Sequence, residues 1–362
     1  MLILAINPGS TSTKTALFEN TTMLFDREVQ HQPDDLKKFK WIYEQQDYRT
    51  RILHDFLATT GTKIGDIDCF VGRGGLVRPC PAGTYEVCDE MLADLKDMSL
   101  WGREHASNLG AMIAAALARE QGKRAFIVDP IVVDELSDLA HLSGYAPIPT
   151  KSVFHCLNVR ARCHRYAAAV GKKIGELNLV CAHMGGGISV ALMQRGRIVD
   201  VNNALLGVGP FTPQRCGALP VGDLVDLCYS GKFASAAELK QELVKRGGLI
   251  SYLGTDSIPE IRRRIADGDH FAEQVVTAMA YQISKSIGAL SAAAHGDIDA
   301  IILTGGMARD SVVIIPYLKK AVSRIAPVVV YEGEEEACAL ASGVYRVLTG
   351  AEELRDYRRD RH

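Results

Sequence analysis

The chain has 362 residues, of which 47% are hydrophobic and 23% are charged. This length predicts two or three domains, and the composition is typical of a soluble globular protein. Lys and Arg number 41 against 43 Asp and Glu, so the net charge of -2 argues against a dedicated nucleic-acid binder. No apolar run approaches the roughly 18 residues of a membrane span, and Met1 to Pro8 lacks the features of a signal peptide.

The nine cysteines are scattered, and no two of them stand in a CxxC spacing. The sequence therefore predicts neither a zinc knuckle nor a dithiol redox motif. Reduced thiols in a cytoplasmic protein are the simplest expectation.

Short apolar runs alternate with helical patterns along the chain, which predicts an α/β fold. In the first part, strands are expected over 2–6, 15–18, 68–71 and 125–128, and helices over 35–60 and 108–121. A second series begins near residue 150, with strands expected over 179–182, 188–193, 197–201, 300–304 and 328–331, and helices over 153–170, 270–294 and 335–348. The charged tail after Thr349 is expected to fray or to pack on the surface.

The two parts of the chain repeat one pattern. Residues 2–18 read as a strand, a glycine-containing loop and a strand, and residues 179–193 have the same form. The apolar runs align when Ala5 is set against Ala182. Two such hairpins, each opening an alternation of strands and helices, predict a duplicated domain with both loops facing one cleft.

The first loop, from Asn7 to Lys14, has the composition of a phosphate cradle. Gly9 lets the backbone approach a ligand, the four residues after it carry hydroxyl groups, and Lys14 adds a positive charge. It is not a Walker A loop, because the GxxxxGK[ST] spacing is absent and a strand follows it. The alternative is a solvated hairpin turn rich in Ser and Thr.

Two further glycine motifs follow predicted strands. His183-Met184-Gly185-Gly186-Gly187 would allow a close backbone approach to a polyphosphate, although a bulged turn has the same composition. Gly305-Gly306 suits an adenosine packed against backbone, although many α/β strands end in two glycines.

Several single polar residues stand where ligands bind in α/β proteins. Arg73 lies between glycines, Asp129 follows a strand, and Arg215 and His155 lie in loops. The acidic run 334–336 at a helix start could bind Mg²⁺ or simply complement the helix dipole. Together with the glycine loops, these residues make a phosphoryl-transfer site plausible, because that chemistry depends on positioning and charge neutralisation.

These motifs, in this order, resemble those of the acetokinase family, the acetate and butyrate kinases of the sugar kinase/Hsp70/actin superfamily. The resemblance covers nearly the whole chain. It is carried by Asn7–Lys14, Gly72–Gly75, Val128–Pro130, Val153–His155, His183–Gly187, Phe211–Arg215 and Thr304–Gly306.

The resemblance implies two duplicated ribonuclease H-like domains of the actin/Hsp70 ATPase type around a cleft. The N-terminal acetokinase-type domain would comprise 1–150 plus about 337–362, because a C-terminal helix returns to it. Residues 151–336 would form the nucleotide-binding domain. The implied activity is reversible, direct in-line phosphoryl transfer from ATP to a short-chain carboxylate, with ADP as product and Mg²⁺ as cofactor. The implied partners are that carboxylate and further copies of the chain in a homo-oligomer through the second domain, with no nucleic acid and no membrane.

The resemblance also implies a role for each matching position. Arg73 would help to hold the carboxylate, Asp129 would be the essential aspartate, His155 would steady the transferring phosphoryl group, and Arg215 would be the second essential arginine. Glu335, with or without Glu336, would serve Mg²⁺. The phosphate- and nucleotide-binding positions would be Asn7, Ser10, Ser12, Lys14, His183, Gly185, Gly186, Gly187, Gly305 and Gly306.

Two departures from acetate kinases bear on the substrate. Gly186 stands where those enzymes have an asparagine, and Gly74 and Gly75 stand where they tend to have valines. Loss of two branched side chains is expected to widen the acyl pocket, and each added buried methylene contributes about 0.8 kcal/mol. We therefore expect butyrate in preference to acetate. The alternatives are an acetate, propionate or branched-chain fatty acid kinase, a sugar or polyol kinase with a catalytic base, and an ATP-gated chaperone or filament protein.

Overall fold

The computed structural model describes residues 1–361 and divides the chain into two compact units. Unit 1 comprises Met1–Asp134, Cys156–Asn158 and the chain from Glu335 onward, and unit 2 comprises Glu135–His155 and Val159–Glu334. The first boundary thus lies earlier than the expected residue 150. The segment after it joins unit 2 because Ile198 N–H donates to Glu135 Oε2 (3.0 Å) and Ser137 N–H donates to the Val199 carbonyl (2.9 Å).

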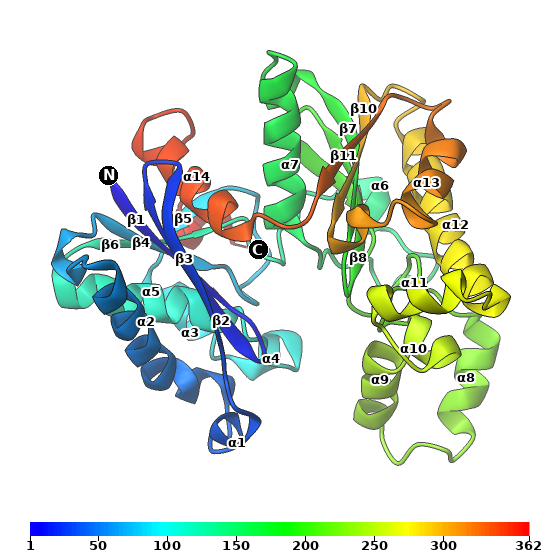
Figure 1. Ribbon diagram of the computed structural model, residues 1–362, viewed down its shortest axis with the longest axis horizontal. Coiled ribbons are helices and arrows are strands. Elements are labelled where there is room, and N and C mark those ends of the chain that lie inside the picture. Colours follow the sequence, from blue (N-terminus) through cyan, green and yellow to red (C-terminus); the bar gives the residue numbers. More distant parts are fainter. Residues whose placement is uncertain (362) are drawn as a thin grey trace. The chain divides into compact units, whose positions relative to one another are not determined.

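Unit 1 is built on a six-stranded mixed sheet in the order β3-β2-β1-β4-β6-β5 (Figure 1). The first three strands form an antiparallel meander, β4 and β6 continue the sheet parallel to β1, and β5 pairs antiparallel with β6. The strands are β1 (Leu2–Pro8), β2 (Ser12–Glu19), β3 (Thr22–Gln30), β4 (Cys69–Arg73), β5 (Thr84–Glu86) and β6 (Arg124–Val128).

Helices cover both faces of this sheet. α2 and α5 bury their apolar residues against Leu4, Ile6 and Phe70 on one face, and α14 packs on the other, where Gly343 lies against Val128 (Figure 1). The helices of unit 1 are α1 (Pro33–Leu36), α2 (Gln46–Thr60), α3 (Asp89–Asp94), α4 (Met98–Trp101), α5 (Asn108–Gln121), α14 (Glu336–Leu348) and α15 (Tyr357–Asp360), with 3₁₀ turns at Ile42–Gln45 and Ile64–Asp66.

Unit 2 repeats this topology in a five-stranded sheet of order β11-β10-β7-β8-β9. Again three antiparallel strands come first, and two later strands continue the sheet parallel to the first of them. The predicted α/β class and the predicted duplication are therefore confirmed by the strand order. The strands are β7 (Asn178–Met184), β8 (Ile188–Gln194), β9 (Arg197–Val201), β10 (Ala300–Gly305) and β11 (Val328–Glu332).

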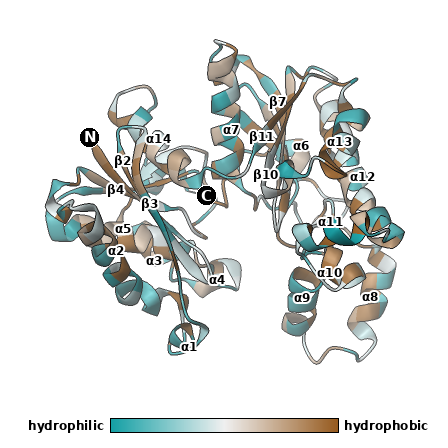
Figure 2. Ribbon diagram, viewed as in Figure 1, coloured by the Kyte–Doolittle hydropathy of each residue, from teal (hydrophilic) through white to brown (hydrophobic). Residues whose placement is uncertain are grey.

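The core of unit 2 lies between its sheet and the helices α12 and α13, and Figure 2 shows hydrophobic residues concentrated in the strands. On the other face, the buried Arg162 of α7 donates to Thr304 Oγ1 (3.2 Å) and to the Gly333 carbonyl (3.1 Å). The helices are α6 (Asp138–His141), α7 (Cys156–Ala169), α8 (Val221–Tyr229), α9 (Ala236–Lys245), α10 (Gly248–Leu253), α11 (Ile258–Ala266), α12 (His270–Ala293) and α13 (Ile314–Val322), with 3₁₀ turns at Ile174–Glu176 and Gly306–Arg309.

The C-terminal tail does not fray. Tyr357 is 2% exposed, and its hydroxyl donates to Asp94 Oδ2 (2.8 Å) while accepting from the Arg78 N–H (2.9 Å). Two hydrogen bonds and a buried ring thus hold α15 on unit 1. Among residues 1–361, no helix is both long and apolar enough to cross a lipid bilayer.

Candidate active site

The β1–β2 loop of unit 1 is fixed from beneath by a buried arginine. Arg49, on α2, is 1% exposed, and its Nη1 donates to the Gly9 carbonyl (2.8 Å), the Ser12 carbonyl (2.9 Å) and Thr13 Oγ1 (3.1 Å). Burial lowers the pKa of Arg49 to about 10. A buried charge is costly without partners. The loop oxygens therefore stabilise the charge of Arg49, and Arg49 in turn holds the loop in the shape that presents these oxygens.

The predicted phosphate-binding side chains of this loop have different exposures. Ser10 is exposed, whereas Ser12 is 9% exposed and lies close to Gly9. Lys14 pairs opposite Asn7 in the β1–β2 ladder, and its ammonium lies 3.8 Å from the Glu28 carboxylate. That exposed pair contributes little, so the lysine can turn toward an anion at small cost.

His31 adds a pH-dependent support to the same loop. Its Nε2 lies 2.8 Å from Thr13 Oγ1, and its side chain is 5% exposed. Burial, and secondly the charge of Arg49, lower the pKa of His31 to about 4. The histidine is therefore neutral in the folded protein, whereas the unfolded chain takes up a proton below about pH 6.5.

We expect this difference to lower the free energy of unfolding as the pH falls from 6.5 toward 4, because only the unfolded chain binds the proton in that window. After allowance for solvent screening, the loss is on the order of 1–2 kcal/mol. Urea unfolding across this range measures it. The His31→Gln variant is expected to show a shallower slope, and the exposed His54→Gln is the matched control. Equal slopes in all three proteins would contradict the assignment.

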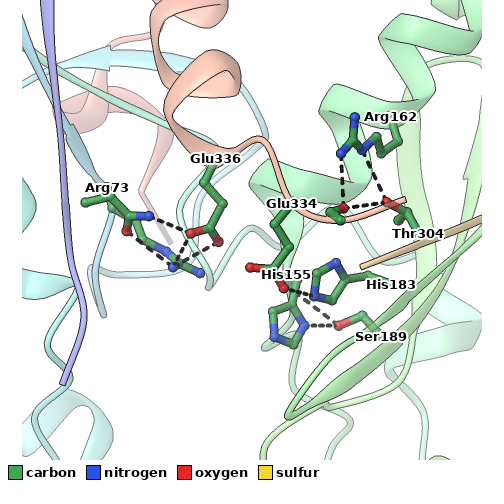
Figure 3. A network of polar contacts seen from close by, with 10 residues as sticks. Arg73, His155, Arg162, His183, Ser189, Thr304, Glu334 and Glu336 are labelled. Carbon is green, nitrogen blue, oxygen red and sulfur yellow. Dashed lines mark hydrogen bonds and ion pairs between the residues drawn. The ribbon is translucent and has the colours of Figure 1, made fainter. Parts of the chain in front are cut away.

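Arg73 and Glu336 lie against each other in unit 1 (Figure 3), and Asn7 bonds to both of them. Arg73 Nη1 lies 2.9 Å from Glu336 Oε1, and Asn7 Nδ2 donates to Glu336 Oε2 (2.6 Å). The side chains of Arg73 and Glu336 are 18% and 12% exposed, so the pair is largely buried. The hydrogen bonds of the guanidinium use Nη1, and its Nε is buried without a partner in the part of the chain that the structure describes.

Asp129 follows β6 in a left-handed conformation, with φ of 43°. It is 3% exposed, its N–H donates to the Gly83 carbonyl (2.9 Å), and its Oδ1 accepts from the Gly83 N–H (2.8 Å). Asp tolerates this backbone better than most residues. The paired bonds hold the carboxyl group rigidly at the carboxyl end of the parallel strands.

The prediction that Gly74 and Gly75 widen an acyl pocket is wrong in its mechanism. A Cβ on Gly74 would lie 2.7 Å from the Cβ of Pro130, and one on Gly75 would lie 2.6 Å from the Cα of Asn108. Both glycines are buried against neighbouring backbone. They permit close packing next to Arg73 and do not border open space.

In unit 2, the β7–β8 glycine loop is tied to the loop that carries Arg215. Gly185 N–H donates to the Gly187 carbonyl (3.0 Å), which closes the glycine turn. Thr212 Oγ1 donates to the Gly186 carbonyl (2.7 Å) and accepts from the Arg215 N–H (3.0 Å). The buried Thr212 therefore sets the distance between the glycine loop and the loop that carries Arg215.

The predicted residues His155, His183, Gly187 and Arg215 lie together in unit 2. A Cβ on Gly187 would collide with the Arg215 guanidinium and stand 3.0 Å from His155 Cε1, so the arginine and the imidazole approach there because no side chain intervenes. The rings of His155 and His183 stack with centroids 4.2 Å apart, and His183 Nε2 lies 3.4 Å from Glu334 Oε1 (Figure 3). Glu334 had no predicted role of its own and was marked only as part of the acidic run 334–336.

Gly305 and Gly306 differ in what surrounds them. Gly305 has φ of 94°, and a Cβ there would collide with the Met184 carbonyl. A glycine at this position therefore allows the backbone to pack closely against Met184. Gly306 is exposed, and apart from its neighbours in sequence no atom of residues 1–361 lies within 4 Å of where its Cβ would stand. Of the two predicted nucleotide contacts, Gly306 is thus the one that is open to a ligand.

The two predicted Mg²⁺ ligands also differ. Both oxygens of Glu336 are engaged by Arg73 and Asn7, whereas the carboxylate of Glu335, at the start of α14, is exposed. Within residues 1–361 there is no group of three or more His, Cys, Asp or Glu side chains placed to hold a metal ion. These donors do not fit a metal held by protein alone, but they fit Mg²⁺ that arrives on nucleotide phosphates and meets one carboxylate.

The fold is that of a known class of two-domain α/β proteins. The crystal structure of Porphyromonas gingivalis acetate kinase superposes with a TM-score of 0.79 at 18% identity, covering 96% of this chain and 99% of that chain. This likeness shows the shared fold.

Sequence comparison then places the chain within that class. Residues 152–327 match the model of the acetokinase family. A probable butyrate kinase of Listeria innocua is 47% identical over 355 residues, and butyrate kinase 2 of Clostridium acetobutylicum is 45% identical over 356 residues. Each alignment covers 98% of this chain and 99% of the relative. The chain belongs to the acetokinase family, as the sequence motifs predicted.

Proposed function

We propose that the protein transfers a phosphoryl group reversibly between ATP and a short-chain carboxylate, with butyrate as the preferred acid. The observation that carries this proposal is Arg73, whose buried Nε has no partner in the described chain while Nη1 binds Glu336. A carboxylate is the acceptor that an arginine edge binds best. The two relatives named as butyrate kinases, which match over nearly the whole chain, favour butyrate.

No strong base is required for this reaction, because a carboxylate is already ionised at neutral pH. Asp129, held by Gly83, would orient the reacting groups. Arg215 would offset the charge repulsion between the carboxylate and the phosphoryl group, and His155 would donate to an equatorial oxygen. His155 also stands at the N-cap position of α7, where the helix dipole favours an anion.

Mg²⁺ would be held by Glu335, directly or through water, and would neutralise charge on the nucleotide phosphates. The phosphates themselves would meet the two loops, which contain Asn7, Ser10, Ser12 and Lys14 in unit 1 and His183 with Gly185, Gly186 and Gly187 in unit 2. The adenosine would pack at Gly306. These assignments are supported by the open glycine backbone at 306 and by the fixed shape of the first loop.

Trapping with hydroxylamine tests the reaction, because acyl phosphates react with it and sugar phosphates do not. A series from acetate to valerate, including isobutyrate, should give the highest kcat/KM with butyrate. Maximal activity with acetate, propionate or isobutyrate would shift the substrate to an alternative acid. ATP turnover without any dependence on a carboxylate would instead favour a non-acyl kinase or an ATP-gated binding protein.

Gly306 provides a test of the nucleotide site. We expect the Gly306→Val variant to fold normally, since its side chain meets no protein atom within 4 Å of the Cβ position. Its KM for ATP should rise about tenfold, which corresponds to roughly 1.4 kcal/mol of lost binding, while the KM for butyrate stays unchanged. Gly305→Val is the contrasting variant, and a lower melting temperature is expected for it. An unchanged KM for ATP in Gly306→Val would remove the glycine from the site.

We also propose that the protein forms a homo-oligomer through unit 2. One face of α8 exposes Val221 (74%), Val225 (49%) and Tyr229 (88%), which follow one another at a spacing of four residues. Light scattering should give at least twice the 39.4 kDa chain mass. The Val221→Lys/Tyr229→Lys double variant should shift the protein toward the monomer. A monomeric wild-type protein would exclude this assembly.

We also propose a cytoplasmic location for the protein. The nine cysteines form no disulfide, although several of them are only partly buried and Cys228 is exposed. A reducing compartment keeps such thiols intact. Cell fractionation tests this location.

A further inference from the structure

Ser189 is the second residue of β8, two positions after the glycine loop, and its hydroxyl contacts His155. The Oγ atom lies 2.7 Å from His155 Nδ1 and accepts from the His155 backbone N–H (3.1 Å) (Figure 3). The Ser189 side chain is 0% exposed, so bulk water does not reach it. A serine that bonds both the backbone and the ring of one histidine can control the orientation of that ring.

These two contacts determine where the hydroxyl proton goes. The backbone N–H of His155 can only donate, so Ser189 Oγ is the acceptor of that bond. A buried hydroxyl also needs an acceptor for its own proton. Within residues 1–361, the other polar atom bonded to this hydroxyl is His155 Nδ1. The proton of Ser189 is therefore directed at Nδ1, which must be unprotonated to accept it.

We propose that Ser189 is a positioning residue that holds His155 in the tautomer with Nδ1 as an acceptor and Nε2 protonated. In a neutral imidazole, an accepting Nδ1 leaves the only ring proton on Nε2. Cε1, the atom between the two nitrogens, faces Gly187 and the Arg215 guanidinium. A protonated Nε2 is a donor suited to a phosphoryl oxygen, whereas an unprotonated Nε2 would repel it. The catalytic meaning of this tautomer rests on the proposed function.

A second neighbour holds the plane of the ring. His183 stacks on His155 at 4.2 Å with an interplanar angle of 27°, and Glu334 lies against His183 Nε2. Stacking fixes the plane but does not distinguish the two nitrogens, because a flipped ring stacks equally well. The bond to Ser189 reaches Nδ1, so it distinguishes the two nitrogens. The stack and the serine therefore have separate tasks.

Nitrogen NMR of the full chain labelled with ¹⁵N-histidine tests the tautomer without any enzyme assay. At mildly alkaline pH, His155 should show an unprotonated Nδ1 and a protonated Nε2, and the His155→Gln variant assigns its signals. In Ser189→Ala, the two forms should mix. A protonated Nδ1 in the wild-type protein would overturn the proposal, and so would an unchanged tautomer in Ser189→Ala.

Kinetics test the consequence. We expect Ser189→Ala to lower kcat about 10- to 100-fold, the usual cost of losing a partner that orients a functional histidine, with both KM values unchanged. Ser189→Thr keeps the hydroxyl and should restore most of kcat. The matched control is Ser291→Ala, which removes another buried hydroxyl of unit 2, one that donates to the Ile287 carbonyl (2.7 Å), and kcat should stay unchanged.

The outcomes separate the two proposals. If the wild-type protein makes no acyl phosphate, the proposed function fails, while the NMR spectrum still reports the tautomer. If the wild type is active but Ser189→Ala keeps its full kcat, the positioning role is wrong. Should Ser189→Ala not fold, the wild-type spectrum and the activity of Ser189→Thr decide the question.

Discussion

Replacing Arg215 with alanine is expected to lower kcat for acyl phosphate formation by a hundredfold or more. This is roughly the cost of removing one preorganised donor that stabilises charge in a transition state. The guanidinium is preorganised in the structure: Thr212 holds its backbone, Nη1 donates to the Ala204 carbonyl, and the bare backbone of Gly187 lets it approach. The KM values should change much less than kcat, because the charge that it stabilises develops in the transition state.

Two companion variants distinguish charge from geometry. Arg215→Lys keeps the charge but lacks the planar fork, so we expect only a small part of kcat to return. Gly187→Ala leaves Arg215 in the sequence but places a Cβ where the guanidinium and His155 now meet, so kcat should fall although no catalytic group is removed. The kcat of each variant is measured by steady-state kinetics with the hydroxamate assay, and its stability by thermal unfolding. A near-normal kcat in Arg215→Ala would refute the role of this arginine.

Replacing Arg73 with alanine is expected to lower kcat/KM for butyrate roughly a hundredfold, mainly through KM, with little change in the KM for ATP. Two charge-assisted hydrogen bonds from one guanidinium edge account for about 3 kcal/mol. The variant also leaves the Glu336 carboxylate, which is 12% exposed, without its cation. A loss of stability should therefore accompany the loss of binding.

Arg73→Lys separates these two effects. Its ammonium can still neutralise Glu336, so the melting temperature should stay near that of the wild type, but it cannot bind a carboxylate through two parallel N–H groups. kcat/KM for butyrate should remain low. Adding free guanidinium ions to Arg73→Ala should restore part of the activity. If Arg73→Ala binds butyrate normally, the carboxylate is held elsewhere and the central observation of the proposed function loses its meaning.

The sequence predicted the buried strands well and the exposed elements poorly. β1, β4, β6 and β10 are short apolar runs that end at Gly, Pro or polar residues, and such runs carry a strong local signal. β3 was not predicted, because nearly all of its residues are exposed and its pairing with β2 is a tertiary property. The helix expected over 35–60 is broken into α1, a 3₁₀ turn and α2, and the helices α8 to α11 were not assigned.

For the site, motifs located the loops but did not show which way side chains point. The structure places His155, His183 and Arg215 close together, while their predicted roles stay predictions. Gly74 and Gly75 were misinterpreted, since the direction of a missing Cβ depends on which backbone packs against it.

Arg49 and Ser189 are among the residues that had no role in the sequence analysis, and Glu334 was named there only as part of an acidic run. Arg49 had a usable signal, because it stands four and seven residues before the buried Leu53 and Phe56 on one face of α2. Ser189 had a weaker signal, two residues after the triple glycine. Only the fold shows that its hydroxyl reaches His155.

The buried arginine beneath the first loop has a thermodynamic consequence. Because Arg49 fastens the carbonyls of Gly9 and Ser12 through contacts within the protein, the proposed binding of phosphate here would cost little chain entropy. The favourable energy of phosphate contacts would then appear as affinity or as rate acceleration and would not be consumed in ordering the backbone. Nucleotide association at the proposed site would therefore not have to wait for this loop to order.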